Sequence, residues 1–149
     1  MKILGSILIL CACISSSLFY EKKQKEKIEA LINCCDFIKY IKSQIEFFLL
    51  PLDKIYLSYK DKNEYINKFI CGNYDENISI FDKDDFEILK NFFSSIGKGM
   101  KKNEISLCEY VISELEKNIE KKKAEYPNKI KVFRIMALFF GFCIVILLI

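Results

Sequence analysis

The chain has 149 residues, of which 52% are hydrophobic and 29% are charged, and it contains no His and no Trp. A single domain is the expectation for this length. Because His is the commonest general base and metal ligand, a His-bearing catalytic triad and a His-bearing zinc site are excluded for this chain alone. The formal net charge is only +3 and is concentrated beside the two apolar ends, which argues against nucleic acid as a partner.

Two uncharged stretches occupy the two ends of the chain. Ile3–Tyr20 carries no charged residue, and Ile135–Ile149 carries none either. A helix the length of the first stretch spans roughly 27 Å at about 1.5 Å per residue, which approaches the ~30 Å hydrocarbon core of a bilayer. We therefore predict transmembrane helices at residues 1–20 and 132–149. Arg134, near the start of the second helix, can extend its side chain to the headgroups.

The basic residues indicate how these helices are oriented. Lys and Arg gather on the inner flank of each apolar end, within residues 21–27 and 117–134. Because cytoplasmic flanks of membrane helices are enriched in Lys and Arg, we expect residues 21–131 to form a cytoplasmic domain with both termini outside. The predicted location is the cell membrane, crossed twice.

The first apolar end has an alternative interpretation as a cleaved signal peptide. The run Leu10-Cys11-Ala12-Cys13 is similar to part of a lipoprotein cleavage site, in which Cys13 would carry the lipid. The protein would then be an extracytoplasmic lipoprotein with a helical interaction domain. Apolar character resumes after Cys13 and continues to Tyr20, which favours a retained membrane helix.

Residues 21–131 are expected to form an antiparallel helical bundle, so the predicted fold class is all-α. Apolar residues three and four apart predict that the first helix continues to about Leu49. Pro51 suits the first turn of a short helix. A second short helix is expected to end before Gly72, and residues 73–80 form the expected loop. The apolar stripe of the first helix consists of Ile28, Leu31, Ile32, Cys35, Ile38, Ile41, Ile45, Phe48 and Leu49.

Capping signals mark the next helix. Asp82 is a good N-cap residue, and Phe81 and Phe86 occupy the two positions of a hydrophobic staple. Gly97 suits the C′ position, where the chain leaves a helix in a left-handed conformation. A last long helix comes after this turn, and Pro127 is expected to kink or break it.

The turn Gly97-Lys98-Gly99 invites comparison with a phosphate-binding loop. That loop needs a Gly five residues before the Gly-Lys pair and a Ser or Thr after it, and it follows a strand. Here Phe92 and Gly99 stand at those positions, and the turn follows a helix. A helix–helix turn is therefore the favoured interpretation.

Metal and nucleophile chemistry receive little support. The acidic cluster is better explained as the capped start of a helix than as a calcium or magnesium site, because such a site needs more oxygen ligands. Its members are Asp82, Asp84 and Asp85. A catalytic Cys34 or Cys35 would lack a His base. We predict no catalytic residue, no cofactor, no metal and no enzymatic activity. The cysteine spacing does not support a zinc site built from Cys34, Cys35, Cys71 and Cys108.

Small residues recur at helical spacing in both apolar ends. Ala12 and Ser16 are four residues apart in the first predicted membrane helix, as are Ala137 and Gly141 in the second. Small residues at this spacing allow helices to approach closely in lipid. These four residues are candidates for packing the two helices together or for forming a homo-oligomer.

Four motifs, in a fixed order along the chain, carry a family resemblance. They are the opening Met1–Gly5, the stretch Gln44–Phe47 followed by Pro51-Leu52, the helix with Asp84, Asp85 and Leu89 that leads to Ile96-Gly97-Lys98, and the run Ile144–Ile149. Their order and the two apolar ends make the sequence similar to the stage III sporulation protein AB family of endospore-forming bacteria. Gly99, Met100 and Glu104 depart from it, because they stand where the family has Ser, Asp and Gln.

The resemblance implies a non-enzymatic part of the channel assembled across the two membranes around the engulfed forespore. It implies a location in the mother-cell membrane facing the forespore, and a cytoplasmic domain similar to the helical domain of the type II secretion platform protein. By that analogy, the protein would dock a secretion-type ATPase and other channel proteins. The net-negative region 53–90 is one candidate docking surface, and the turn at Gly97 and Lys98 is the part that matches a family motif.

Overall fold

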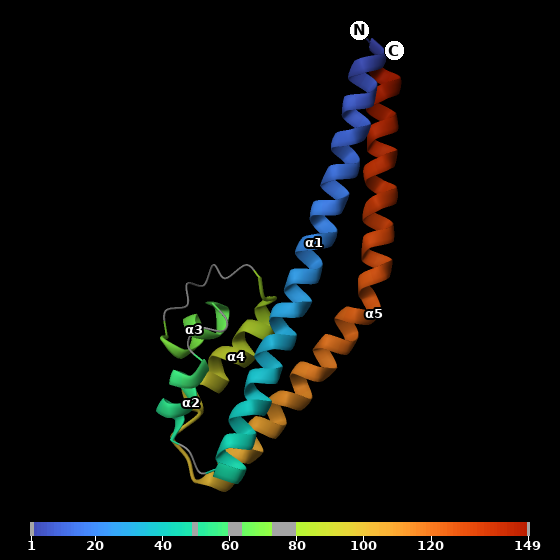
Figure 1. Ribbon diagram of the computed structural model, residues 1–149. Helices are drawn as coiled ribbons and strands as arrows, with labels where there is room; N and C mark the ends of the chain where they lie inside the picture. The colour runs from blue at the N-terminus through green and yellow to red at the C-terminus, as the bar shows by residue number, and fades with distance from the viewer. Residues whose placement is uncertain (1, 49–50, 60–63, 73–79, 149) are drawn as a thin grey trace. The chain divides into compact units, whose positions relative to one another are not determined.

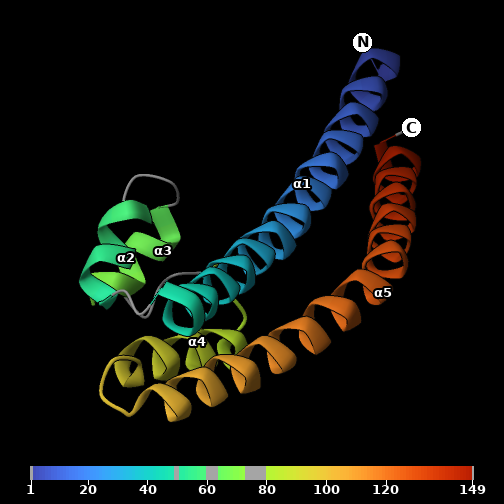
Figure 2. The ribbon, with the colours of Figure 1, turned by 60° about the horizontal axis from the view of Figure 1, so that its bottom comes forward.

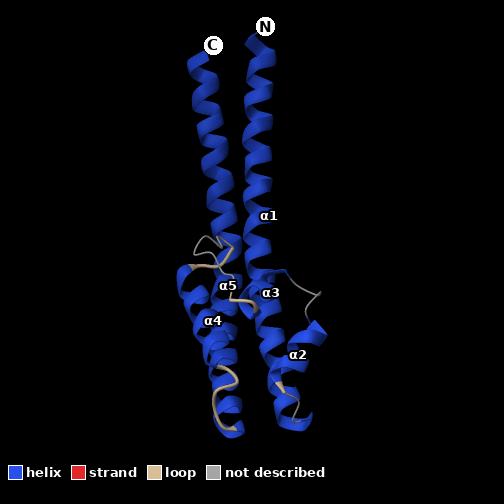
Figure 3. Cartoon of the chain, turned by 90° about the vertical axis from the view of Figure 1, so that its left-hand side faces the viewer, coloured by secondary structure: helices blue, strands red, loops and turns tan. Residues whose placement is uncertain are grey.

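The structure is a computed structural model that describes residues 2–48, 51–59, 64–72 and 80–148. Every regular element within these ranges is a helix, which confirms the expected all-α class (Figures 1 and 3). The expected loop at residues 73–80 lies almost wholly outside the described ranges. The elements are α1 (Lys2–Ser43), the π-helix η1 (Gln44–Phe48), α2 (Leu52–Tyr59), α3 (Glu64–Ile70), α4 (Lys83–Ser95) and α5 (Lys101–Leu148).

The chain divides into two compact units. Unit 1 consists of Met1–Glu26 and Lys121–Ile149, and unit 2 consists of Lys27–Glu120. Unit 1 therefore contains the first part of α1 and the last part of α5, while unit 2 contains the remainder of both helices and all of α2, α3 and α4. The predicted boundaries of a central domain at residues 21–131 stay a prediction.

Unit 2 is organised around an antiparallel pair formed by its parts of α1 and α5. The ammonium of Lys39 on α1 lies 2.7 Å from the carboxylate of Glu116 on α5, and that of Lys42 lies 2.8 Å from the carboxylate of Glu109. Residue numbers therefore rise along one helix as they fall along the other, so the two helices are antiparallel. Helix α4 packs against this pair with Leu89 and Phe92, and Figure 2 shows α4 alongside α5. The largest fully buried side chains are Phe37, Phe92, Leu31, Ile38, Ile41, Ile55, Ile66, Leu89 and Leu115.

The apolar stripe of α1 ends differently from its prediction. Most residues of the stripe up to Ile45, such as Leu31 and Ile38, are buried in the core as expected. Phe48 was expected on the same face, but its side chain is 66% exposed. The reason is the change to a π-helix at Gln44, because a π-turn accommodates an extra residue and rotates the residues after it away from the α-helical stripe.

The start of α4 follows the predicted capping pattern only in part. Asp82 occupies the N-cap position with an extended backbone, but its side chain makes no capping hydrogen bond. Its carboxylate instead lies 3.4 Å from the ammonium of Lys27 on α1. The staple residues Phe81 and Phe86 both pack against the ring of Phe69 on α3, at 5.8 and 5.7 Å between ring centroids.

Unit 1 is a pair of helices, and α5 continues through Pro127 without interruption. The helix is therefore not broken at Pro127, and the other expected outcome, a kink there, stays a prediction. Proline removes one backbone hydrogen bond from the ladder, but residues on both sides of it are held against α1. Tyr126 donates a 3.3 Å hydrogen bond to Glu21, and Arg134 donates one of 3.1 Å to the same carboxylate. Within the described residues, no helix combines the length and the apolar character that crossing a membrane requires.

Candidate functional site

The turn between α4 and α5 is closed by a carboxylate from its own chain. Gly97 has a φ of +88°, which suits the C′ position predicted for it. Its backbone N–H donates to Glu104 Oε2 at 2.8 Å, and the N–H of Gly99 donates to Oε1 at 2.7 Å. Glu104 is buried in the first turn of α5, where the helix dipole also favours a negative charge.

This arrangement gives the Gly97-Lys98-Gly99 turn a structural role. The backbone donors that a phosphate group would need are already satisfied by Glu104, and the same carboxylate would repel an anion. Sequence reasoning noted Glu104 only as a departure from the family pattern and missed its role in the turn, although an acidic residue in the first turn of a helix was a signal for it. Lys98 is exposed on the turn.

The turn is joined to the end of the π-helix η1. Lys101 donates a 2.9 Å hydrogen bond to the backbone carbonyl of Glu46. The residues next to these two, Phe47, Phe48 and Met100, are 73%, 66% and 80% exposed. We call these three residues the exposed tip of unit 2. Large apolar side chains grouped on a protein surface mark a contact site for another molecule, and π-turns occur frequently at functional sites.

The cysteines of unit 2 include three buried thiols, none of which is in a disulfide. Burial raises the pKa of Cys34 to about 12, with a smaller contribution from Cys35, and burial also raises the pKa of Cys108 to about 12. The pKa of Cys35 is raised for the same reason. A nucleophilic cysteine needs the opposite shift, so the thiols behave as small core residues rather than as reactive groups.

The acidic residues near α4 do not converge on a metal site. Asp85 is buried and accepts a 2.8 Å hydrogen bond from Asn118 on α5. Among the described residues, no group of three or more His, Cys, Asp or Glu side chains is arranged to hold a metal ion. Asp85 therefore ties two helices together, a role for which sequence spacing gave no signal.

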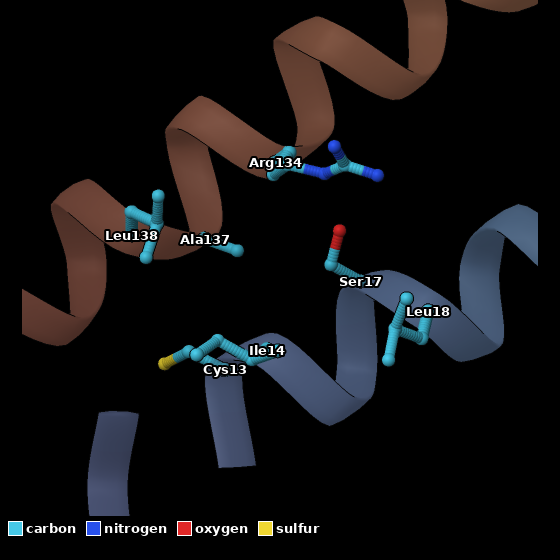
Figure 4. Close-up of a pocket in the computed structure, with 7 residues that line it drawn as sticks. All are labelled: Cys13, Ile14, Ser17, Leu18, Arg134, Ala137 and Leu138. Carbon is cyan, nitrogen blue, oxygen red and sulfur yellow. The ribbon is translucent and has the colours of Figure 1, made fainter. Parts of the chain in front are cut away.

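The small residues singled out in the apolar ends differ in their positions within unit 1. Gly141 is buried and Ala137 is half-buried, and Ala137 lines a pocket between α1 and α5. Ala12 and Ser16 are exposed, and the hydroxyl of Ser16 bonds to the carbonyl of Ala12 within its own helix. The face of α1 that lines this pocket instead carries Cys13, Ser17 and two apolar residues (Figure 4).

Taken together, these features describe an all-α protein whose notable surfaces are apolar and whose polar contacts join helices to one another. Residues 71–149 match the family model described as stage III sporulation protein AB, and this match covers more than half of the chain. The protein therefore belongs to that family, which is a family of sporulation proteins. Neither a curated protein nor a solved structure matches the chain.

Proposed function

We propose that the protein is a non-enzymatic platform component of a sporulation channel, held in the membrane by unit 1 and docking a cytoplasmic secretion-type ATPase through unit 2. The observation that carries the membrane part is the exposure of large apolar side chains in unit 1. Burying apolar surface away from water gains about 25 cal/mol per Å², so covering a row of such residues with lipid is favourable. The residues are Ile14, Leu18, Phe19, Val132, Ile135, Met136, Leu138, Phe139, Phe140, Phe142, Ile144 and Ile146.

The distribution of charge supports the proposed orientation. Basic residues flank both apolar ends on the side of unit 2, and Lys and Arg favour the cytoplasmic side of membrane helices. Unit 2 then lies in the cytoplasm. The membrane that we propose is the mother-cell membrane facing the forespore, which is the location that the family resemblance implies.

For the docking part, the exposed tip of unit 2 is better supported than the net-negative region 53–90. In that region Glu64 pairs with Lys68 at 2.7 Å, Asp82 lies near Lys27, and Asp85 is buried. Part of the negative charge of this region is thus paired or buried within unit 2 and does not face a partner. The tip combines three exposed apolar side chains with the exposed basic residues Lys98, Lys101 and Lys102. This combination suits an apolar partner surface with an acidic rim.

The alternative, an extracytoplasmic lipoprotein cleaved before Cys13, is less well supported. Cys13 lies within the continuous helix α1 and lines the pocket with residues of α5. Cleavage there would remove the α1 residues that precede Cys13 and their contacts with α5. The two interpretations are distinguished by the side of the membrane on which Cys71 is found.

Cys71 provides a native reporter for the test, because its thiol is exposed and lies in unit 2. Non-sporulating cells that express the full chain, in which the extracytoplasmic face of the membrane is open to the medium, would be treated with a membrane-impermeant maleimide before and after permeabilisation, and the labelled cysteine identified by mass spectrometry. We expect labelling of Cys71 only after permeabilisation, and loss of that signal in the Cys71→Ser control. Labelling in intact cells, together with lipid attached to Cys13, would support the lipoprotein instead.

A further inference from the structure

The pocket between α1 and α5 in unit 1 has the composition of a site for an amphiphile with an anionic head. It has a volume of about 370 Å³. Ile14, Leu18, Ala137 and Leu138 provide apolar walls, and Arg134 provides a positive charge. Figure 4 shows the side chain of Arg134 on the α5 side and the hydroxyl of Ser17 directed toward α5 from the opposite wall.

Ser17 is the second, independent indication of a ligand. Its side chain is 5% exposed, and its hydroxyl has no hydrogen-bond partner among the described residues. A buried hydroxyl without a partner carries a free-energy cost of about 1–3 kcal/mol. The neighbouring Ser15 and Ser16 show the usual alternative, because each bonds to the backbone carbonyl four residues earlier. The Ser17 hydroxyl is instead available to a group in the pocket.

Arg134 can hold an anion while keeping its protein partner. One terminal nitrogen of its guanidinium lies 3.1 Å from Glu21 Oε2. A guanidinium offers five N–H donors, so the contact with Glu21 leaves donors for a second acceptor. The negative charge of Glu21 is also offset by Lys25 at 3.5 Å, and Tyr126 donates a hydrogen bond to it. The negative charge of Glu21 is therefore largely compensated, and it does not prevent an anion from binding beside Arg134.

We propose that this pocket binds the phosphate of an anionic phospholipid, with Arg134 and Ser17 as donors to the phosphate and the apolar walls in contact with an acyl chain. A phosphate accepts charge-assisted hydrogen bonds from Arg and ordinary ones from a hydroxyl. The apolar walls distinguish a lipid from a free phosphate ion, which would gain nothing from them. This inference rests on the proposed membrane location of unit 1.

The test uses the full chain purified in a mild detergent and supplied with phosphatidylglycerol, phosphatidylcholine or inorganic phosphate. Native mass spectrometry measures retained lipid, and thermal unfolding measures stabilisation. We expect phosphatidylglycerol alone to be retained and to raise the unfolding temperature. Arg134→Gln and Ser17→Leu, which remove the charge and fill the pocket, should each weaken retention about tenfold, as expected for the loss of one strong charge-assisted contact or of the cavity.

Two matched variants separate binding from folding. Lys131→Gln removes an exposed positive charge one turn before Arg134 and outside the pocket, and should change retention less than about twofold. Glu21→Gln breaks the same ion pair as Arg134→Gln but leaves the guanidinium in place, so it should keep or improve retention. Equal retention in Arg134→Gln, Ser17→Leu and the wild type would overturn the proposal, as would equal stabilisation by inorganic phosphate.

Flotation of the full chain with liposomes separates this proposal from the one on which it rests. If the chain does not float with liposomes of any composition, the membrane location fails and the lipid site fails with it. If the chain floats equally with neutral and anionic liposomes and retains no phosphatidylglycerol, only the lipid site fails. Flotation together with selective retention supports both.

Discussion

Asn118 on α5 donates a 2.8 Å hydrogen bond to Asp85, whose side chain is buried in the first turn of α4. The bond joins two helices of unit 2 across 33 positions of sequence. A hydrogen bond to a charged group contributes more than one between neutral groups, and a buried carboxylate that loses its donor is costly. This contact is therefore a test of how α4 is fixed to α5.

Asp85→Ala should lower the free energy of unfolding by about 1.5–3 kcal/mol, because it removes a charge-assisted bond and leaves Asn118 without this acceptor. Glu87→Ala, at an exposed position of the same helix beyond its first turn, is the matched control and should change it by less than about 0.5 kcal/mol. A double-mutant cycle with Asn118→Ala measures the coupling in chemical denaturation. A coupling energy near zero would contradict the role assigned to this pair.

The Glu104 carboxylate is expected to fix the conformation of the α4–α5 turn. Glu104→Ala removes both acceptors from the backbone N–H groups of Gly97 and Gly99, and we expect a loss of about 2–3 kcal/mol in unfolding free energy. Glu104→Gln keeps one acceptor and should lose less. Hydrogen exchange at the two glycine amides should accelerate in both variants. Glu120→Ala, exposed on the same helix, should leave the exchange rates unchanged.

Gly97 is the position in the turn where a larger residue is least tolerated. Its φ of +88° is unfavourable for any residue with a Cβ, and a Cβ there would lie 2.5 Å from Leu52 Cδ1. Gly97→Ala should therefore destabilise unit 2 by about 1–2 kcal/mol. Gly72 also has a positive φ, of 67°, but a Cβ there meets nothing within 4 Å, so Gly72→Ala should cost less. Thermal unfolding compares the two, and an equal cost would show that the Leu52 contact contributes nothing.

Alkaline pH should destabilise unit 2 through its buried thiols. Burial raises the pKa of Cys34 and of Cys108 from an ordinary value of 9.0 to about 12. Between these values the unfolded chain loses protons that the folded chain retains, so the free energy of unfolding falls as the pH rises from about 9 to about 12. Burial also raises the pKa of Tyr56, from 10.0 to about 12, and adds to the decline.

The double variant Cys34→Ala, Cys108→Ala should be less stable at neutral pH but should show a shallower decline above pH 9. Cys71→Ala, at an exposed position, should keep the slope of the wild type. Denaturant unfolding at a series of pH values gives these slopes. If the double variant has the wild-type slope, ionisation of the two thiols is not the cause of the decline.

Features that depend on neighbouring residues were the ones that sequence reasoning could predict. The C′ position of Gly97 follows from a pattern a few residues long, and the helical class follows from apolar periodicity. The roles of Asp85 and Glu104 depend on the partner that the folded structure brings to each carboxylate, so the amino-acid sequence alone did not reveal these roles. The exposure of Phe48 depends on an α-to-π change that periodicity does not encode.

The most direct test of the proposed platform role is co-purification of the family's secretion-type ATPase with the full chain from membranes of sporulating cells. We predict that the wild-type protein retains the ATPase and that replacing Phe47, Phe48 and Met100 by Ser abolishes this retention without changing thermal unfolding. Tyr110→Ser is the control, because Tyr110 is exposed on α5 about 15 Å along the helix from Met100. Retention of the ATPase by the triple variant, or its absence from the folded wild-type protein, would contradict the account.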